Sequence, residues 1–303
     1  MELEFKPVVA GDIDRLRPFY GMRPNKTCDS VFLDSFLWKD YYHVQCAVSE
    51  GRAVLWLMEK DGQVSTAMPL CREEDLPYFF QQMVDYFSEV LHKPFYISLA
   101  DEEAVQYLNL DPALFEVEEQ VDLKDYLYSG EELRKLEGKK FVKKRNHLNG
   151  FKRMYEGRYE YRRLCCSDRH EVWQFMERWR QHREEVGAME LSLDYEVAGI
   201  HDILKNCSSL YVRMAGVYID GQLEAFTIGS LNVRENMAVI HIEKANPEIR
   251  GLYQFINQQF LINEFPQAEL VNREDDVGME GLRKAKMSYY PIGFARKYMV
   301  RER

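Results

Sequence analysis

The sequence predicts a mixed α/β protein of the α+β type, built from two domains that each hold a mixed β-sheet flanked by helices. The chain has 303 residues, which is long for one compact unit and sufficient for two units of about 150 residues. An order of hairpin, strand, helix and strand occurs once in each half. The 46% hydrophobic and 13% aromatic residues supply apolar surface for two cores. We therefore expect the whole chain to fold.

The first half carries the clearer hairpin signal. Asp61-Gly62 separates two runs that alternate and are rich in β-branched and aromatic residues, a pattern typical of a tight hairpin. Apolar residues at helical spacing, from Leu76 to Val90, then predict one buried helix face. The expected elements are strands over 44–49, 53–59 and 63–70, a helix over 73–90 and a strand over 95–99.

The second half repeats this order of elements, although not the residues themselves. Asp220-Gly221 takes the hairpin position. The expected elements are strands over 209–218, 223–231 and 237–245, a helix over 247–263 and a strand over 269–272. Asn246 is expected to cap that helix, with Pro247 in its first position and Glu248 near the positive end of its dipole.

Between the halves, residues 131–155 predict one connecting helix. Its narrow apolar stripe consists of Phe141, Leu148, Phe151 and Tyr155. Two further helices are expected over 168–185 and 194–206. The resulting domain ranges are 1–130, a basic connecting helix over 131–157, and 158–303.

Charge and composition exclude several classes of protein. A formal net charge of −10 argues against a protein that mainly coats nucleic acid. No apolar stretch is long enough to span a membrane, and the first seven residues do not resemble a signal peptide, so a cytoplasmic location is expected. The six cysteines match neither a redox motif nor a zinc spacing, which predicts reduced, mostly buried thiols. No metal site and no tightly bound cofactor are expected.

The common catalytic signatures GxSxG, GxGxxG and HExxH are missing. Gly138-Lys139-Lys140 has the wrong spacing for a phosphate-binding loop. His241-Ile242-Glu243 resembles half of a zinc deaminase motif, but the Pro-Cys-x-x-Cys half does not follow. We interpret His241 and Glu243 as two side chains on one strand face.

A basic stretch gives the first positive signal for a function. It carries a local charge of about +8 and consists of Lys139, Lys140, Lys143, Lys144, Arg145, Lys152, Arg153, Arg158, Arg162 and Arg163, against Glu156 and Glu160. Lys139, Lys140, Lys143 and Lys144 are expected on one side of the connecting helix, opposite the apolar stripe. Such a patch would attract the phosphates of RNA or of a nucleotide carrier. The alternative is a solvated helix face.

Residues 271–289 give the second signal, because a predicted strand leads directly into a polar turn and a basic helix. Its carboxyl end carries Asn272, Arg273 and Glu274, at the edge where open α/β sheets bind ligands. Helix capping and ion pairing explain some of the following charges. They do not explain Arg283 and Lys286, which share one helix face.

These segments carry a family resemblance. Residues 143–149, the run 272–289, and Glu243-Lys244-Ala245 with Gly251, Tyr253, Gln254 and Asn257 resemble an uncharacterised bacterial family related to the C-terminal domain of phosphatidylglycerol lysyltransferases. The likeness covers nearly the whole chain. It implies two tandem acetyltransferase-like (GNAT-like) folds, kin to Fem-type enzymes that transfer an amino acid from aminoacyl-tRNA.

The resemblance also implies roles for individual residues. Substrate binding would fall to Lys144, Arg145, Asn146, Tyr253, Gln254, Asn257, Asn272, Arg273, Arg283, Lys284 and Lys286. Catalytic roles would fall to Glu243, Glu274, Asp275 and Asp276, which would hold an α-amino group or act as base, and to Tyr289, which would donate to an oxyanion or leaving group. The expected cleft is the seam where Arg145 and Asn146 meet residues 272–286.

Two departures from the wider family bear on which donor and which acceptor the protein is expected to use. The lipid-modifying enzymes carry a membrane domain before this one, which these residues do not include, so a small-molecule or peptide acceptor is expected. Coenzyme A enzymes grip pyrophosphate at a helix start where this sequence has Glu248 and Tyr253, which favours aminoacyl-tRNA over acyl-CoA as co-substrate. The alternatives are an acyl-CoA-dependent N-acyltransferase and a non-catalytic binding module. The oligomeric state is left open.

Overall fold

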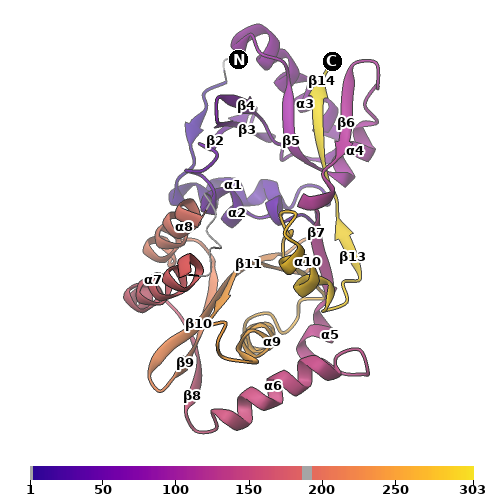
Figure 1. Cartoon of the computed structure of the whole chain (residues 1–303). Helices are drawn as coiled ribbons and strands as arrows, with labels where there is room; N and C mark the ends of the chain where they lie inside the picture. The colour runs from indigo at the N-terminus through magenta and orange to yellow at the C-terminus, as the bar shows by residue number, and fades with distance from the viewer. Residues whose placement is uncertain (1–2, 186–192) are drawn as a thin grey trace.

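The computed structural model describes residues 3–185 and 193–303 and contains three β-sheets with helices packed around them (Figure 1). The first part of the chain forms β1 (Lys6–Pro7), α1 (Ile13–Tyr20), α2 (Phe32–Leu37), β2 (Gln45–Ser49), β3 (Ala53–Lys60), β4 (Gln63–Ser65), α3 (Leu76–Asp85), β5 (Tyr96–Asp101), α4 (Glu102–Leu108), β6 (Phe115–Glu119) and β7 (Asp125–Ser129). Two helices, α5 (Gly130–Lys135) and α6 (Val142–Met154), connect it to the rest.

The remainder forms β8 (Tyr159–Arg163), α7 (Arg169–Glu185), α8 (Leu193–Asn206), β9 (Arg213–Ile219), β10 (Gln222–Asn232), β11 (Met237–Ala245), α9 (Leu252–Glu264), β12 (Leu270–Asn272), α10 (Glu280–Met287), β13 (Gly293–Ala295) and β14 (Lys297–Glu302). Both predicted hairpins are present. Asp61 and Gly62 have φ angles of 52° and 80°, and Asp220 and Gly221 have 50° and 83°, the pair of positive values that a tight two-residue hairpin requires.

Two strands cross between the halves. The sheets have the orders β1-β2-β3-β4, β5-β14-β6 and β13-β7-β12-β11-β10-β9-β8. The last strand, β14, therefore lies between two strands of the first half, and β7 pairs with β12 and β13 of the second half. The domain ranges 1–130, 131–157 and 158–303 stay a prediction. Strands β7 and β14 each pair with strands of the other half, so no single cut in the chain separates the sheets.

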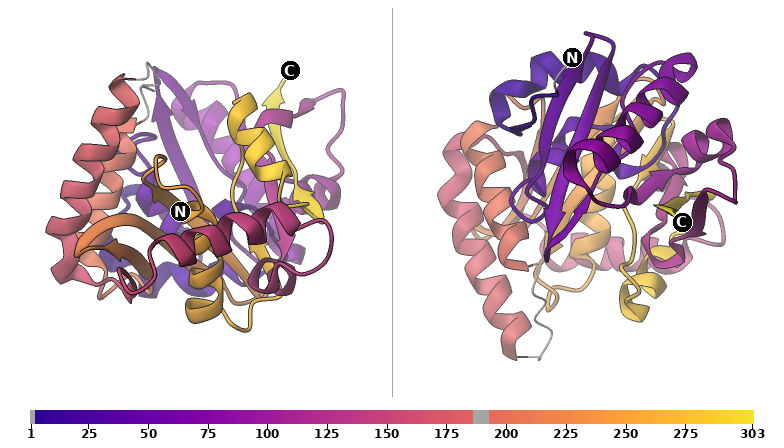
Figure 2. Two further views of the ribbon diagram at one scale, coloured as in Figure 1. Left: turned by 60° about the horizontal axis from the view of Figure 1, so that its bottom comes forward. Right: turned by 90° about the horizontal axis from the view of Figure 1, so that it is seen from above.

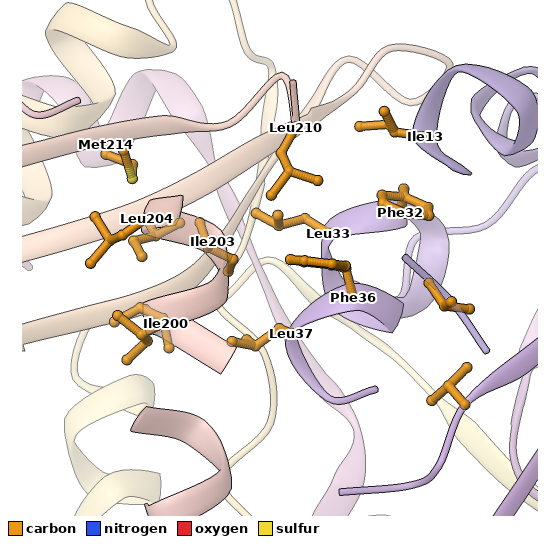
Figure 3. Close-up of a cluster of buried hydrophobic side chains, with 14 of the residues drawn as sticks. Ile13, Phe32, Leu33, Phe36, Leu37, Ile200, Ile203, Leu204, Leu210 and Met214 are labelled. Atoms are coloured by element: carbon orange, nitrogen blue, oxygen red, sulfur yellow. The ribbon is translucent and has the colours of Figure 1, made fainter. Parts of the chain in front are cut away.

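A hydrophobic core also spans the two halves. Figure 3 shows α2 packed against α8, with Leu33, Phe36 and Leu37 facing Ile200 and Ile203. The helices approach closely because Gly199 has no side chain: a Cβ there would lie 2.2 Å from the Leu37 carbonyl oxygen. Figure 2 shows α7 and α8 side by side along one flank of the molecule.

The predicted single connecting helix is wrong, because the chain breaks between α5 and α6. Leu136 and Gly138 adopt φ angles of 51° and 80°, and the Arg145 guanidinium donates to their two carbonyl oxygens at 2.5 and 2.7 Å. Lys139 and Lys140 consequently lie in the connecting turn and not on the helix. The predicted apolar stripe is confirmed in part, with Phe141, Leu148 and Phe151 buried and Tyr155 half-buried.

The helix expected from residue 247 begins later, at Leu252. Asn246 caps a preceding turn by accepting from the Glu248 N–H, and the position before the helix belongs to Gly251 at φ 91°. A Cβ at Gly251 would lie 2.3 Å from the His147 carbonyl oxygen of α6. The close approach of α6 therefore fixes where α9 begins.

Two further sequence expectations concern the cysteines and membrane spans. Cys166 and Cys207 form a disulfide, with their Cα atoms 5.9 Å apart, so the expectation of six reduced thiols is wrong for this pair. Cys28, Cys46 and Cys71 are free and buried as expected, whereas Cys165 is exposed. Within residues 3–185 and 193–303, every helix is too short or too polar to cross a membrane.

Candidate active site

A β-bulge in the central strands places Glu243 against α9. The pairing of β10 with β11 shifts between Ile228 and Gly229, so that His241 is skipped in the register. Such a bulge re-aims the side chains that follow it and is common beside active sites. Beyond the bulge, the Glu243 carboxylate accepts a hydrogen bond of 2.7 Å from Asn257 of α9. His241 bonds instead to Ser230 and Glu274, so the two side chains have separate partners.

Arg273 completes this arrangement from the carboxyl end of β12. Its guanidinium donates to Glu243 at 2.8 Å, and it stacks over the rings of Tyr289 and Tyr128 with centroid distances of 4.8 and 5.8 Å. Buried ion pairs need additional hydrogen bonds to offset desolvation, and Asn257 supplies one to the carboxylate.

Two polar atoms beside this ion pair have no partner within the described part of the chain. They are the Nη1 of Arg273, a donor, and the Oδ1 of Asn257, an acceptor. Buried polar groups are almost always hydrogen-bonded in native proteins, so an unmatched donor and an unmatched acceptor on either side of Glu243 indicate a place for a polar ligand. We call Glu243, Asn257, Arg273, Tyr289 and Lys144 the Glu243 site.

Lys144 reaches the Glu243 site from α6. Its ammonium lies 3.8 Å from the centroid of the Tyr289 ring and donates to the Ser288 hydroxyl at 2.6 Å. Burial, with a contribution from Arg273, lowers the pKa of Lys144 to about 8. This amine is therefore partly neutral near physiological pH and is able to accept a proton.

Tyr289 lies between the two cations and stays protonated. Its side chain is buried, and burial raises the pKa of its hydroxyl to about 12. Gln254 and Arg273 are its hydrogen-bonding neighbours. Tyr289 can therefore donate a proton or a hydrogen bond to a ligand at neutral pH.

A second group of sequence-predicted residues joins α10 and the turn before it to the sheet. Asp276 accepts hydrogen bonds from Arg283, at 2.9 Å for each of two nitrogens, and from Tyr126. Lys286 donates to the carbonyl oxygens of Arg273 and Asp275. In this geometry Asp276, Arg283 and Lys286 hold the α10 segment in place.

Asn272 and Asp275 belong to a buried polar cluster between the halves. Asn272 is fully buried and donates to Asp125 at 2.9 Å and to the Lys26 carbonyl oxygen at 2.8 Å. Lys297 Nζ lies 2.8 Å from Asp125 and 3.7 Å from Asp275. We call Asp125, Asn272 and Lys297 the interface cluster.

Glu274 lies beside that cluster with a left-handed backbone at φ 56° and faces His241 at 3.0 Å. Burial raises the pKa of Glu274 well above its usual value and lowers the pKa of His241 to about 3. His241 is therefore neutral near pH 7, and of its two ring nitrogens one donates and the other accepts in the contacts with Glu274 and Ser230.

The remaining predicted residues lie outside the Glu243 site or at its edge. Tyr253 and Gln254 are half-buried in the first turn of α9. Asn146 is exposed on α6, and Lys284 is exposed and pairs with Glu280 at 2.6 Å. The seam expected at Arg145 and Asn146 is formed by Lys144 instead, because Arg145 is bound to backbone carbonyl oxygens.

Sequence reasoning missed the buried charged residues that the first half and the C-terminus contribute to this region. Asp125, Lys297 and Asp34 come from β7, β14 and α2 and were not selected. Asp34 did carry a signal, because a carboxylate among Phe32, Leu33, Phe36 and Leu37 is unusual on an apolar helix.

The sheets and their helices define a class of protein, a pair of acetyltransferase-like domains in one chain. FemX shares this fold, with a TM-score of 0.62, 10% identity and 98% and 96% of the two chains covered. A tandem GNAT protein from the clavulanic acid pathway also shares it, with a TM-score of 0.50 and 9% identity. The chain belongs to the family of phosphatidylglycerol lysyltransferase C-terminal domains, whose model matches residues 23–301.

Three further proteins are similar to this chain in sequence or in fold. A conserved protein of unknown function from Bacteroides thetaiotaomicron is 27% identical and has a TM-score of 0.90, with both chains fully covered. The L-PGS structure from Bacillus licheniformis is 15% identical and has a TM-score of 0.67, covering 95% of this chain and 91% of that one. An uncharacterized protein of Mycoplasmoides gallisepticum is 28% identical over 178 residues, and this chain spans 56% of its length.

Proposed function

We propose that this protein transfers an amino acid from aminoacyl-tRNA to an amine or hydroxyl group of a small-molecule or peptide acceptor. Family membership supports acyl-group transfer in general. The observation that carries the finer proposal is the unmatched pair beside Glu243, because Asn257 Oδ1 would accept from an α-amino group and Arg273 Nη1 would donate to an ester carbonyl oxygen.

In the proposed reaction, the acceptor nitrogen or oxygen attacks the ester carbonyl carbon. The new C–N or C–O bond forms, the ester C–O bond breaks, and the terminal ribose hydroxyl of the tRNA leaves. Lys144, with its pKa near 8, would take the proton from the acceptor, and Tyr289 would donate to the developing oxyanion or the leaving oxygen. The protein would otherwise act by holding the two partners in line.

The start of α9 favours aminoacyl-tRNA over acyl-CoA as donor. The Gly251 position lies against the His147 carbonyl oxygen of α6, and Arg250 contacts the His147 ring at 3.3 Å. Pyrophosphate binding at a helix start needs open N–H groups there. A screen of coenzyme A thioesters should therefore leave the melting temperature of the protein unchanged, and a clear rise would favour the acyl-CoA alternative.

Two neighbouring lysines of α6 offer a matched test. Lys143 is exposed and Lys144 reaches the Glu243 site, so Lys143→Met and Lys144→Met remove the same charge from different environments. Bacterial tRNA charged with each of the twenty radiolabelled amino acids would be mixed with the protein and a panel of amines, including free amino acids and short peptides.

We expect binding that weakens steeply as salt rises, and single-turnover transfer that falls about a hundredfold in Lys144→Met but less than about threefold in Lys143→Met. The absence of tRNA binding at low salt would overturn the proposal. Equal transfer by the two variants would remove Lys144 from the mechanism.

A further inference from the structure

A cavity of about 90 Å³ lies in the first half of the chain, apart from the Glu243 site. Asp29 and Asp34 line it together with the rings of Trp38, Tyr42 and Trp56. A single water occupies about 10–15 Å³ of such a volume, so the cavity has room for a group of about six heavy atoms. We call this space the Asp34 cavity.

The Asp34 carboxylate is buried in this cavity, with 8% of the residue exposed, and forms no ion pair with a cation of residues 3–185 and 193–303. Its carboxyl group is hydrogen-bonded to another carboxyl group, that of Asp29. Glu274 also faces it, and the nearby Lys297 ammonium lies 2.8 Å from Asp125 and 3.8 Å from Asp29. Burial and the two acidic neighbours raise the pKa of Asp34 well above its usual value, as expected for a carboxylate that lacks a counter-charge.

A second unmatched group lines the same cavity. Arg23 is 4% exposed, and its two terminal nitrogens each donate to Asp101 at 2.6 Å. Its Nε has no acceptor within residues 3–185 and 193–303. The walls of the Asp34 cavity therefore present the hydrogen-bonded carboxyl groups of Asp29 and Asp34, an unmatched donor on Arg23 and three aromatic rings.

We propose that the Asp34 cavity binds a small organic ammonium compound, whose charged nitrogen contacts Asp34 and Asp29 while its carbon chain packs against Trp38, Tyr42 and Trp56. Aromatic faces attract cations, and a buried carboxylate is stabilised by an opposite charge. A compound that also carries a hydrogen-bond acceptor for Arg23 Nε, such as an amino acid or an amino alcohol, binds more tightly than a simple alkylamine.

A metal ion is the competing occupant, because Cys28, Asp34 and Glu274 offer ligand atoms within 4.8 Å of one another. Two observations favour the organic cation. Lys297 Nζ lies 3.1 Å from the Cys28 sulfur, where a metal would be repelled, and burial raises the pKa of the Cys28 thiol. Neither Cys28 nor Glu274 lines the cavity, whereas the aromatic rings do.

Calorimetric titration of the purified protein tests this inference without tRNA and without transfer activity. A negative result would therefore not contradict the proposed transfer reaction. The probes are n-pentylamine and ethanolamine, each compared with 1-pentanol. We expect the amines to bind and the alcohol to fail. Asp34→Asn should weaken amine binding tenfold or more, and Trp38→Leu about threefold or more.

Asp61→Asn is the matched control, because Asp61 lies in an exposed turn whose left-handed backbone suits Asn. It should bind amines as the wild type does. Thermal unfolding would establish that each variant is folded. If Asp34→Asn does not fold, the preference of the wild-type protein for amines over the alcohol tests the inference instead. Equal binding of n-pentylamine and 1-pentanol, no binding of any amine, or Zn²⁺ binding that Cys28→Ser abolishes would each overturn the inference.

Discussion

The segment from Asn272 to Tyr289 has two sides that differ in how fully their polar groups are partnered. On the interface side, Asn272 makes hydrogen bonds through both side-chain atoms, and Lys286 is held by two carbonyl oxygens. On the side of the Glu243 site, Arg273 has a nitrogen with no partner in the described structure.

This difference separates residues that look alike in sequence. Arg273, Arg283 and Lys286 are all cations of one motif, yet Arg283 is bound to Asp276 and Asp122 and only Arg273 offers an unmatched donor. Saturated polar groups stabilise the fold, whereas unsatisfied ones indicate a ligand. If this distinction holds, substitutions on the two sides should differ in whether they mainly affect stability or activity.

The largest effect on stability is expected from Lys297→Met in the interface cluster. Asp125 is fully buried, and removing Lys297 leaves its charge without the ammonium at 2.8 Å. Removing one partner of a buried ion pair costs about 3–5 kcal/mol, measurable by urea unfolding. The control Lys284→Met alters an exposed lysine and should change stability by less than about 0.5 kcal/mol. Equal costs for the two variants would contradict the structural role of the cluster.

Glu243→Gln should affect stability less and activity more. The amide still offers an oxygen to Asn257 or Arg273, but Arg273 loses its counter-charge, which costs about 1–3 kcal/mol. The rate of transfer should nevertheless fall about a hundredfold or more, since Arg273 and Asn257, which face the ligand, lose the carboxylate that orients them. Urea unfolding and single-turnover transfer would be measured on the same sample. If Glu243→Gln lost no more transfer activity than a folded variant of the interface cluster, the proposed difference between the two sides of the segment would be contradicted.

The sequence predicted both hairpins and the strands that flank them, because alternation and Asp-Gly turns are local signals, but it did not predict β1, β6, β7, β8, β13 or β14. It also selected Arg273, Glu243 and Tyr289, which the structure brings together. The helix break at Leu136 was missed because Arg145 supports it by bonding backbone carbonyl oxygens, which no residue pattern reveals. The sequence interpretation therefore assigned Arg145 to a ligand.

The interface cluster could not be predicted for a different reason. Asp125 and Lys297 lie far apart in the chain and meet only because β7 and β14 cross between the halves. Strand exchange depends on long-range pairing, which the periodicity of a single strand does not encode. Similarly, the start of α9 depends on the approach of α6 at Gly251, so the local cap signal at Asn246 predicted the wrong boundary.

Asp276→Asn should give a smaller loss of stability, which is present near neutral pH and disappears in acid. Its hydrogen bonds with Arg283 lower the pKa of Asp276 from 3.8 to about 2 in the folded protein. The folded state therefore holds this proton less tightly than the unfolded state does. The contribution of Asp276 is complete above pH 3.8 and is lost as the pH falls through 2. Urea unfolding from pH 5 to 2 should show a shallower loss of stability in the variant, and identical slopes would contradict this role.

The smallest expected effect is the titration of Lys144 in the Glu243 site. Its pKa of about 8 lies below the usual 10.5, so between these values the folded protein has released a proton that the unfolded chain retains. Stability from this residue therefore rises with pH from 8 to 10.5 and is lowest below 8. NMR of ¹³C-methylated lysines should show one signal with a midpoint near 8 that Lys144→Met removes and Lys143→Met preserves. A midpoint near 10.5 would mean that the amine is fully charged at neutral pH, and Lys144 would then serve as an electrostatic contact for the tRNA end and not as the base.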